Sequence, residues 1–163
     1  MKAGGENGER GYQLTFCIAY IRDFMMENEI LAESFETTVA WSDATALCQN
    51  VKQRIWQEHE KRGLPGTPFI SCRVTQLYET GVCVYFYYAF HHAGVEEPSA
   101  VYSQLEHIAR EEILNSGGSL SHHHGIGKLR RGFLPEIFSP AALRWRRELK
   151  ASIDPDDLFG CGN

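Results

Sequence analysis

The sequence predicts an α+β fold, in which helices pack on one face of an antiparallel β-sheet. The clearest observation is a pair of alternating segments, 69–78 and 82–90, joined by a short loop, which indicates a β-hairpin. The second observation is that apolar residues recur at helical spacing before and after this hairpin. With 43% hydrophobic and 12% aromatic residues, the 163-residue chain has enough apolar side chains for one core.

The N-terminal part is expected to begin as a loop and to continue as a helix and a strand. Residues 1–11 are rich in glycine and polar residues, and we expect an exposed loop at a truncated start. From Tyr12 to about Ala32 the apolar spacing is helical, and from Glu33 to Trp41 it changes to period two, which predicts a strand. The core-facing residues of this strand would be Phe35, Val39 and Trp41, and those of the opposite face Ser34, Glu36 and Thr38.

A second helix is predicted between this strand and the hairpin. Ser42 is a suitable N-cap, the helix would run to Arg62, and Gly63 would end it. Its inward residues would be Leu47, Val51 and Ile55.

Both hairpin strands place their apolar residues at even positions, so a single buried face requires an even-sum register. A three-residue loop, 79–81, gives that register and places Gly81 where a positive φ is needed. The odd positions then form a polar, aromatic face that includes Tyr85 and Tyr87, with Thr75 opposite Tyr85 and Arg73 opposite Tyr87. The face has too few apolar residues to be core, although both tyrosines could equally be ordinary residues of a solvated sheet.

The C-terminal part begins with a third helix after Pro98 that ends at Gly117-Gly118. A polar loop at 119–127 and a helical region through 144–150 follow, and Asp154-Pro155 predicts the start of a short terminal helix. The inward residues of the third helix would be Val101, Leu105, Ile108 and Ile113 or Leu114. We therefore divide the chain into a loop at 1–11, an α+β domain at 12–116 and a histidine loop with a helical segment at 117–163.

Three consecutive histidines, His122, His123 and His124, lie in the 119–127 loop. In an extended loop, His122 and His124 would share one side and His123 would face the other. A zinc site needs acidic or thiolate partners at suitable spacing, and the neighbouring sequence offers none, so we predict no metal site. The histidines are then either solvated loop residues or contacts to a substrate or cofactor, because glycines beside them allow a ligand to approach.

The charged residues exclude one class of function and leave others open. The net charge of −5 argues against a general nucleic-acid-binding protein. Arg22 lies beside the apolar stripe of its helix, where a salt bridge to Asp23 or another acid is favoured over a phosphate. A basic cluster near the C-terminus indicates a solvated helix face, or else a contact with a lipid surface or another domain. Its members are Lys128, Arg130, Arg131, Arg144, Arg146, Arg147 and Lys150.

Several segments together resemble the alkyldihydroxyacetonephosphate synthase family, and the resemblance spans almost the whole chain. The segment Asp-Pro…Phe at 154–159 alone indicates the FAD-linked oxidase C-terminal domain of the vanillyl-alcohol oxidase group. The SLSHHHG loop at 119–125, combined with AESFET at 32–37, narrows the resemblance to the synthases. The other matching segments are 18–23, 72–76 and 85–90.

The resemblance implies a ferredoxin-like substrate domain of an enzyme that makes the ether bond of ether lipids. Such an enzyme exchanges the acyl group of acyl-dihydroxyacetone phosphate for a long-chain alcohol, using FAD without net redox change. The FAD-binding domain of that family precedes this region, so we expect 117–163 to pack against it and the chain alone to hold FAD weakly. The family also implies a peroxisomal or glycosomal location, although we recognise no targeting signal here, and peripheral membrane contact or oligomers remain open.

The resemblance further implies roles for individual residues. Tyr85 would move the substrate proton, His123 would assist this transfer, and Arg22 would pair with the substrate phosphate. The remaining residues of the predicted substrate pocket are Ser34, Thr38, His122 and His124. Two alternatives remain, namely a fragment of a flavin-linked 2-hydroxy-acid dehydrogenase and a truncated, non-catalytic partner.

Overall fold

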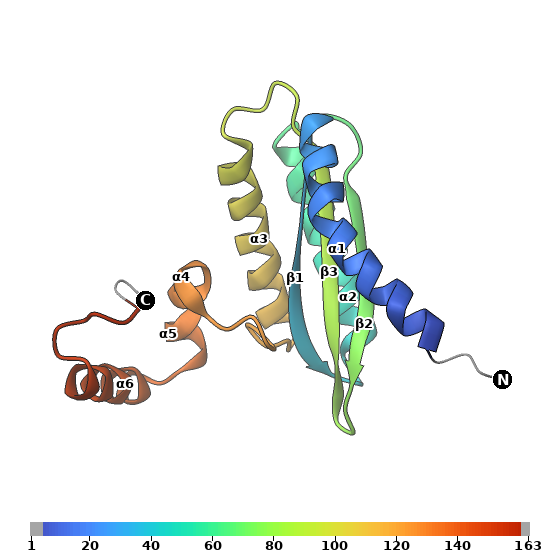
Figure 1. The fold of residues 1–163 in the computed structure, drawn as a ribbon. Coiled ribbons are helices and arrows are strands. Elements are labelled where there is room, and N and C mark those ends of the chain that lie inside the picture. Colours follow the sequence, from blue (N-terminus) through green and yellow to red (C-terminus); the bar gives the residue numbers. More distant parts are fainter. Residues whose placement is uncertain (1–4, 161–163) are drawn as a thin grey trace.

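A three-stranded antiparallel sheet forms the centre of the protein (Figure 1). The structure is a computed structural model that describes residues 5–160. The strands β1 (Ile30–Ala40), β2 (Phe69–Leu77) and β3 (Gly81–His91) lie in the order β1-β3-β2. The expected α+β fold with an antiparallel sheet is thereby confirmed.

The helices α2 (Ala44–Lys61) and α3 (Pro98–Asn115) cover one face of the sheet and enclose the core with it. The inward residues expected for α2 are all buried. In α3 the buried residues are Tyr102, Leu105, Ala109, Arg110 and Ile113, whereas Val101 and Ile108 are half-buried. The helix α1 (Gly5–Glu27) lies on the opposite side of the sheet from α2 (Figure 1), so helices flank both faces.

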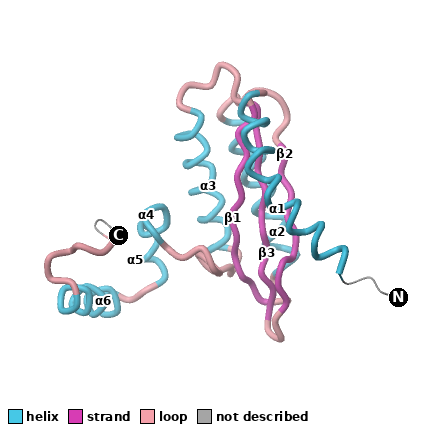
Figure 2. Tube along the Cα trace, viewed as in Figure 1, coloured by secondary structure: helices cyan, strands magenta, loops and turns pink. Residues whose placement is uncertain are grey.

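The C-terminal segment extends away from the sheet as short helices joined by loops (Figure 2). It comprises α4 (Gly127–Arg130), the 3₁₀ turn η1 (Arg131–Phe133), α5 (Leu134–Ile137) and α6 (Pro140–Ile153). The expected terminal helix after Asp154 is absent from residues 154–160. Asp154 instead ends α6, and its carboxylate accepts hydrogen bonds from the backbone N–H groups of Leu158 and Phe159, each at 2.9 Å.

Several element boundaries differ from the sequence prediction. Within the described residues, α1 begins at Gly5, where a loop was expected, and it ends at Glu27 rather than at Ala32. Ile30 begins β1 because it pairs with His91 of the long strand β3. Trp41 lies in a turn and is 49% exposed, so it is not a core residue. Asp43, not Ser42, occupies the N-cap position of α2.

The hairpin obtains its even-sum register by a different route from the one expected. The loop between Tyr78 and Gly81 has two residues, and Tyr78 N–H donates to Gly81 O at 2.9 Å. A β-bulge between Val74 and Gln76 shifts the register by one residue, so Tyr85 lies opposite Arg73 rather than Thr75. Gly81 has no positive φ, and its requirement is instead steric, because a Cβ there would lie 2.3 Å from Val39 O.

None of the helices described between residues 5 and 160 is both long and apolar enough to cross a membrane.

Candidate functional site

The loop that carries the three histidines is held against the edge of β1. Ser119 N–H donates to Thr38 O at 2.8 Å, and Thr38 N–H donates to Ser119 Oγ at 2.9 Å. Thr37 Oγ1 donates to Ser119 O at 2.7 Å. The loop leaves α3 through Gly118, where a Cβ would lie 2.7 Å from Ile113 Cγ2 and from Leu47 Cδ1. The hydroxyl and backbone contacts of Thr37 and Thr38, together with the close packing at Gly118, therefore fix the position where the histidine loop begins.

Glu36 is the centre of this arrangement, and its side chain is fully buried. Its carboxylate accepts hydrogen bonds from Ser121 Oγ at 2.8 Å and from the backbone N–H of His122 at 2.7 Å. The backbone N–H groups of His123 and His124 also donate to it, at 3.4 and 3.1 Å. The ring atom His124 Nδ1 lies 3.2 Å from Glu36 Oε1. One carboxylate thus gathers three successive backbone amides and one imidazole.

Glu36 is ionised in this environment. Burial by itself raises the pKa of its carboxyl, but the donors from His122, Ser121, His124 and His123 together outweigh burial and lower the pKa to about 2. Hydrogen bonds to a carboxylate favour its charged form, and here they compensate for the loss of water. A fixed negative charge therefore lies directly beneath the histidine loop.

A buried cation holds the beginning of the same loop. Arg110 of α3 is 2% exposed, and its Nη1 donates to Leu120 O at 2.8 Å. Its Nε and Nη2 donate to Glu106 Oε1 at 3.0 and 2.8 Å. The periodic patterns of the sequence marked neither Arg110 nor Glu36 as a site residue, because each gains its role from contacts with a distant segment.

The histidine side chains form a connected chain with two tyrosines. Tyr85 Oη lies 2.7 Å from His123 Nε2 and 3.1 Å from His124 Nε2. His122 Nδ1 lies 2.7 Å from His123 Nδ1, and Tyr78 Oη lies 2.7 Å from His122 Nε2. The chain therefore runs from Tyr78 at the end of the hairpin to Tyr85 and on to Glu36.

One set of donors and acceptors satisfies every link with neutral side chains. If His124 Nδ1–H donates to Glu36, its Nε2 accepts from the Tyr85 hydroxyl. The Tyr85 oxygen then accepts from His123 Nε2–H, which leaves His123 Nδ1 to accept from His122 Nδ1–H. His122 Nε2 finally accepts from the Tyr78 hydroxyl. A proton can therefore move along this hydrogen-bonded chain by successive transfers between neighbouring groups.

The Tyr85 hydroxyl keeps its proton. Burial, followed by the charge of Glu36 and the neighbouring Cys83 and Tyr87, raises the pKa of Tyr85, and Arg73 opposes this effect. Tyr85 is therefore a hydroxyl that can donate to one imidazole while it accepts from another.

The predicted arrangement of the histidines differs from the observed one. His123 and His124 both contact Tyr85, whereas His122 faces Tyr78. The expectation that His122 and His124 share a side was wrong, because the loop is a series of bends gathered on Glu36 rather than an extended segment. The period-two alternation of the strand predicted the correct face for Glu36, which it shares with Ser34 and Thr38. It did not predict that Glu36 binds the histidine loop.

A cavity of about 750 Å³ lies beside the hydrogen-bonded histidines and tyrosines, between α1 and the sheet. Arg22 and Ser34 both line it, and apolar residues of α1 form much of its wall. Tyr87 also lines the cavity and stacks on Tyr85, with ring centroids 6.1 Å apart. Its apolar α1 residues are Ile18, Ala19, Ile21 and Met25. The cavity thus combines an apolar wall with the Arg22 guanidinium, and the Tyr87 ring connects it to Tyr85.

The predicted site residues therefore fall into three adjoining places. Tyr85, His123 and His124 form the centre, Arg22 and Ser34 lie in the α1 cavity, and Thr38 and His122 line an open cavity of about 560 Å³. Arg22 is 57% exposed at its side chain and lies 3.7 Å from Asp23, as its residue pattern alone favoured.

The basic cluster near the C-terminus is partly neutralised. Lys150 pairs with Asp154, and it also lies 2.8 Å from Asp157. Arg130 Nη1 donates to Gly125 O at 2.8 Å, and its Nη2 lies 3.8 Å from Glu106. Arg130 therefore helps to hold the histidine loop, whereas Arg144, Arg146 and Arg147 are exposed on α6.

Comparisons with known proteins identify relatives of this chain. The chain is 42% identical over 160 residues to the alkyldihydroxyacetonephosphate synthase of Caenorhabditis elegans, a match that covers 98% of this chain and 27% of that protein. It is 32% identical over 130 residues to an uncharacterized FAD-linked oxidoreductase of Escherichia coli, covering 78% of this chain and 26% of that protein. A solved structure of alkyldihydroxyacetonephosphate synthase superposes with a TM-score of 0.59 and 28% identity, over 87% of this chain and 22% of that chain.

The chain spans about a quarter of the length of the curated relatives it matches. The family described as FAD linked oxidases, C-terminal domain, matches residues 4–163. The sequence match thus covers nearly the whole chain, and the structural match covers most of it. The protein therefore belongs to the C-terminal domain family of the FAD-linked oxidases.

Proposed function

We propose that this chain is the substrate-side domain of an FAD-dependent alkyldihydroxyacetonephosphate synthase. Such an enzyme exchanges the acyl group of acyl-dihydroxyacetone phosphate for a long-chain alcohol and forms the ether bond. The observation that carries the proposal is the Tyr85 hydroxyl, which lies between His123 and His124 in a chain that ends on the buried Glu36. The identity to the synthase of Caenorhabditis elegans over 98% of the chain supports the choice of reaction.

The geometry suits proton transfer at a carbon next to a carbonyl group. Replacing the acyloxy group at that carbon requires a proton to leave the carbon and later to return. Tyr85 can give its proton to His124 and take one from His123. It can therefore exchange protons with the substrate while the two histidines restore its protonation state. We assign the catalytic roles to Tyr85 and His123 and a supporting role to His124.

The α1 cavity suits an amphiphilic phosphate ester. Arg22 offers a planar guanidinium that can bind a phosphate in bidentate fashion, and its present neighbour Asp23 is an exposed partner that a phosphate can replace. Ser34 adds a hydroxyl on the same wall, and the apolar α1 side chains suit a hydrocarbon chain. We also assign substrate contacts to Thr38 and His122, which line the open cavity, and to His124, which contacts Tyr85.

The described residues fit a flavin ring beside Tyr85. The sheet face presents two stacked tyrosine rings, Tyr85 and Tyr87, on which a planar ring can stack. When bound there, FAD supplies the electrophilic ring chemistry of the reaction without net redox change. This chain contributes the proton transfer, the phosphate contact and the apolar wall.

The first test is Tyr85→Phe in the flavin-loaded enzyme. We expect activity to fall by roughly 10²–10⁴-fold, the usual contribution of a positioned acid–base group, with an unchanged melting temperature. Tyr20→Phe, which removes the hydroxyl of an exposed tyrosine on α1 outside the cavity lining, is the control and should keep most activity. Near-normal ether formation by Tyr85→Phe would remove Tyr85 from the mechanism.

A second candidate function is oxidation of a 2-hydroxy acid. The identity of 32% to an FAD-linked oxidoreductase favours it, because histidines beside a flavin also suit proton removal coupled to hydride transfer. Product analysis separates the two functions. Ether formation supports the synthase, and reduction of an added electron acceptor by a 2-hydroxy acid supports the dehydrogenase.

We also propose a peroxisomal or glycosomal location and, through the exposed arginines of α6, contact with an anionic membrane surface. Both rest on the family resemblance and on the charge of α6. Colocalisation of a fluorescent fusion with a peroxisomal marker, and salt-dependent sedimentation with anionic vesicles, test them.

A further inference from the structure

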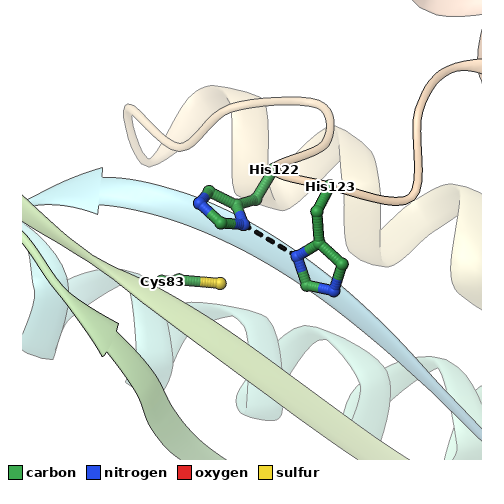
Figure 3. Close-up of side chains that lie close together, drawn as sticks. All are labelled: Cys83, His122 and His123. Carbon is green, nitrogen blue, oxygen red and sulfur yellow. Dashed lines mark hydrogen bonds between the residues drawn. The ribbon is translucent and has the colours of Figure 1, made fainter.

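We propose that Cys83, His122 and His123 form a binding site for Zn²⁺, and that an ion bound there blocks the proton path through Tyr85. The two histidines come from the loop after α3, and Cys83 comes from β3, 39 positions earlier in the chain. One ligand atom from each of the three residues lies within 4.8 Å of the others. Figure 3 shows the Cys83 sulfur directed toward the two imidazole rings.

This position of Cys83 supplies the thiolate partner that the sequence near the histidines lacks. Cys83 lies opposite Thr38 of β1 and Gln76 of β2, on the face that also carries Tyr85. It is fully buried beneath the histidine loop. A thiol that faces two imidazoles provides the mixed sulfur and nitrogen ligands that Zn²⁺ prefers over Mg²⁺ or Ca²⁺.

The orientation of the rings is an independent argument for the site. The Nδ1 atoms of His122 and His123 face one another at 2.7 Å, and each Nε2 is held by a tyrosine hydroxyl at 2.7 Å. Histidines that bind metals characteristically have the second ring nitrogen fixed by a hydrogen-bond partner, which sets the ring orientation and the tautomer. Tyr78 and Tyr85 provide those partners, so both Nδ1 lone pairs can be directed to one point.

Ion binding requires a balanced change in protons, and the ligand atoms, which lie within 4.8 Å of one another, must reach tetrahedral spacing. The Cys83 thiol loses its proton to solvent, and the His122 proton moves from Nδ1 to Nε2, where it is donated to Tyr78. Tetrahedral Zn²⁺, with Zn–N bonds of about 2.0–2.1 Å, places two nitrogens about 3.4 Å apart, so the Nδ1 atoms must separate by roughly 0.7 Å. His123 is exposed and His122 half-buried, so their rings can move by this amount, and water can take the fourth position.

Inhibition follows from the same contacts, and this part rests on the proposed function. With Zn²⁺ on both Nδ1 atoms, the hydrogen bond between His122 and His123 is lost, so His123 cannot take a new proton at Nδ1 from His122 after its Nε2 proton passes to Tyr85. Micromolar Zn²⁺ would then suppress ether formation, and a chelator would restore it. The site itself does not depend on the reaction, because it is defined by the three side chains alone.

Co²⁺ substitution and X-ray absorption test the site. We expect the Co²⁺-loaded protein to show intense ligand-field bands of a tetrahedral site and a thiolate charge-transfer band, at one ion per chain. The Zn²⁺-loaded protein should show one sulfur at about 2.3 Å and nitrogens at about 2.0–2.1 Å. Cys83→Ser should abolish the thiolate band, and His122→Gln, which leaves the buried strand intact, should weaken Co²⁺ binding at least tenfold.

Cys17→Ser is the control, because Cys17 is an exposed thiol on α1 and a possible adventitious ligand. A thiolate band that survives Cys83→Ser, or that disappears with Cys17→Ser, overturns the proposed site. If the Cys83-dependent band forms but Zn²⁺ leaves turnover unchanged, the site stands and the inhibition is refuted. Loss of turnover in Tyr85→Phe, measured without metal, tests the proposed function separately.

Discussion

The Glu36 carboxylate determines where the three imidazoles lie, because it binds the backbone of the loop rather than only one side chain. Its acceptors hold the N–H groups of His122, His123 and His124 together. Such convergence of amides on one carboxylate overrides the extended geometry that a polar loop would otherwise adopt. A single strand residue therefore sets the order of the whole hydrogen-bonded chain.

The role of Glu36 can be tested with Glu36→Gln. The amide has one acceptor oxygen in place of two, and its NH₂ group would face backbone N–H donors, so buried donors lose their partners. We expect the free energy of unfolding to fall by about 1–3 kcal/mol. We also expect turnover to fall by more than the loss of folded protein explains. The measurement is chemical denaturation together with turnover.

Glu33→Gln is the matched control, because Glu33 is an exposed carboxylate on the same strand. It should change the stability by less than about 0.5 kcal/mol. Equal effects of the two substitutions would show that Glu36 does not hold the loop.

The two interpretations of Arg22 make different predictions for Arg22→Lys. An exposed pair with Asp23 contributes only about 0–1 kcal/mol, so a purely structural arginine could be replaced without effect. A phosphate contact would lose its planar, bidentate donors. We expect a higher KM for acyl-dihydroxyacetone phosphate, little change for the alcohol and an unchanged melting temperature. An unaltered response to the phosphate substrate would return Arg22 to the structural interpretation.

At the scale of the elements, periodicity predicted the helices and strands but not how they end or pair. Period two and helical spacing depend on neighbouring residues, so the faces of α2 and β3 could be read from the sequence. The bulge between Val74 and Gln76 could not be predicted from the sequence. It shifts the register after a two-residue turn so that the apolar residues of both strands lie on the buried face of the sheet. Glu36, Arg110 and Cys83 were missed for a related reason, since their partners lie far away in the sequence.

Gly81 shows how one position controls the pairing of two strands. An added Cβ would lie 2.3 Å from Val39 O, a backbone atom that cannot move aside without separating β1 from β3. We expect Gly81→Ala to lower the unfolding free energy by about 1–3 kcal/mol, as overpacking in a core does. Gly132→Ala, where no other atom would lie within 4 Å of the added Cβ, is the control and should change stability little. Thermal denaturation of both variants is the measurement, and a neutral Gly81→Ala would contradict the steric argument.

At the scale of the whole molecule, burial is concentrated in the sheet and in the two helices that cover it. The core joins β1, β3, α2 and α3, whereas none of residues 140–153 in α6 is buried. The histidine loop lies between these regions and is tied to the core through Glu36 and Arg110. The molecule therefore combines a well-packed half with a C-terminal segment that depends on few contacts.

Hydrogen exchange can measure this gradient of stability. Amides that open only when the core unfolds exchange slowly, and amides in a helix without buried side chains exchange through local opening. We therefore expect slow exchange in β3 and α3, fast exchange in α6, and intermediate protection at His122 and His124, whose N–H groups donate to a buried carboxylate. Glu36→Gln should remove the protection of these two loop amides while leaving β3 slow. If the loop amides exchanged as fast as those of α6 in the unaltered protein, the buried carboxylate would not be ordering the histidines, and their chain to Tyr85 would have to be held by the imidazoles alone.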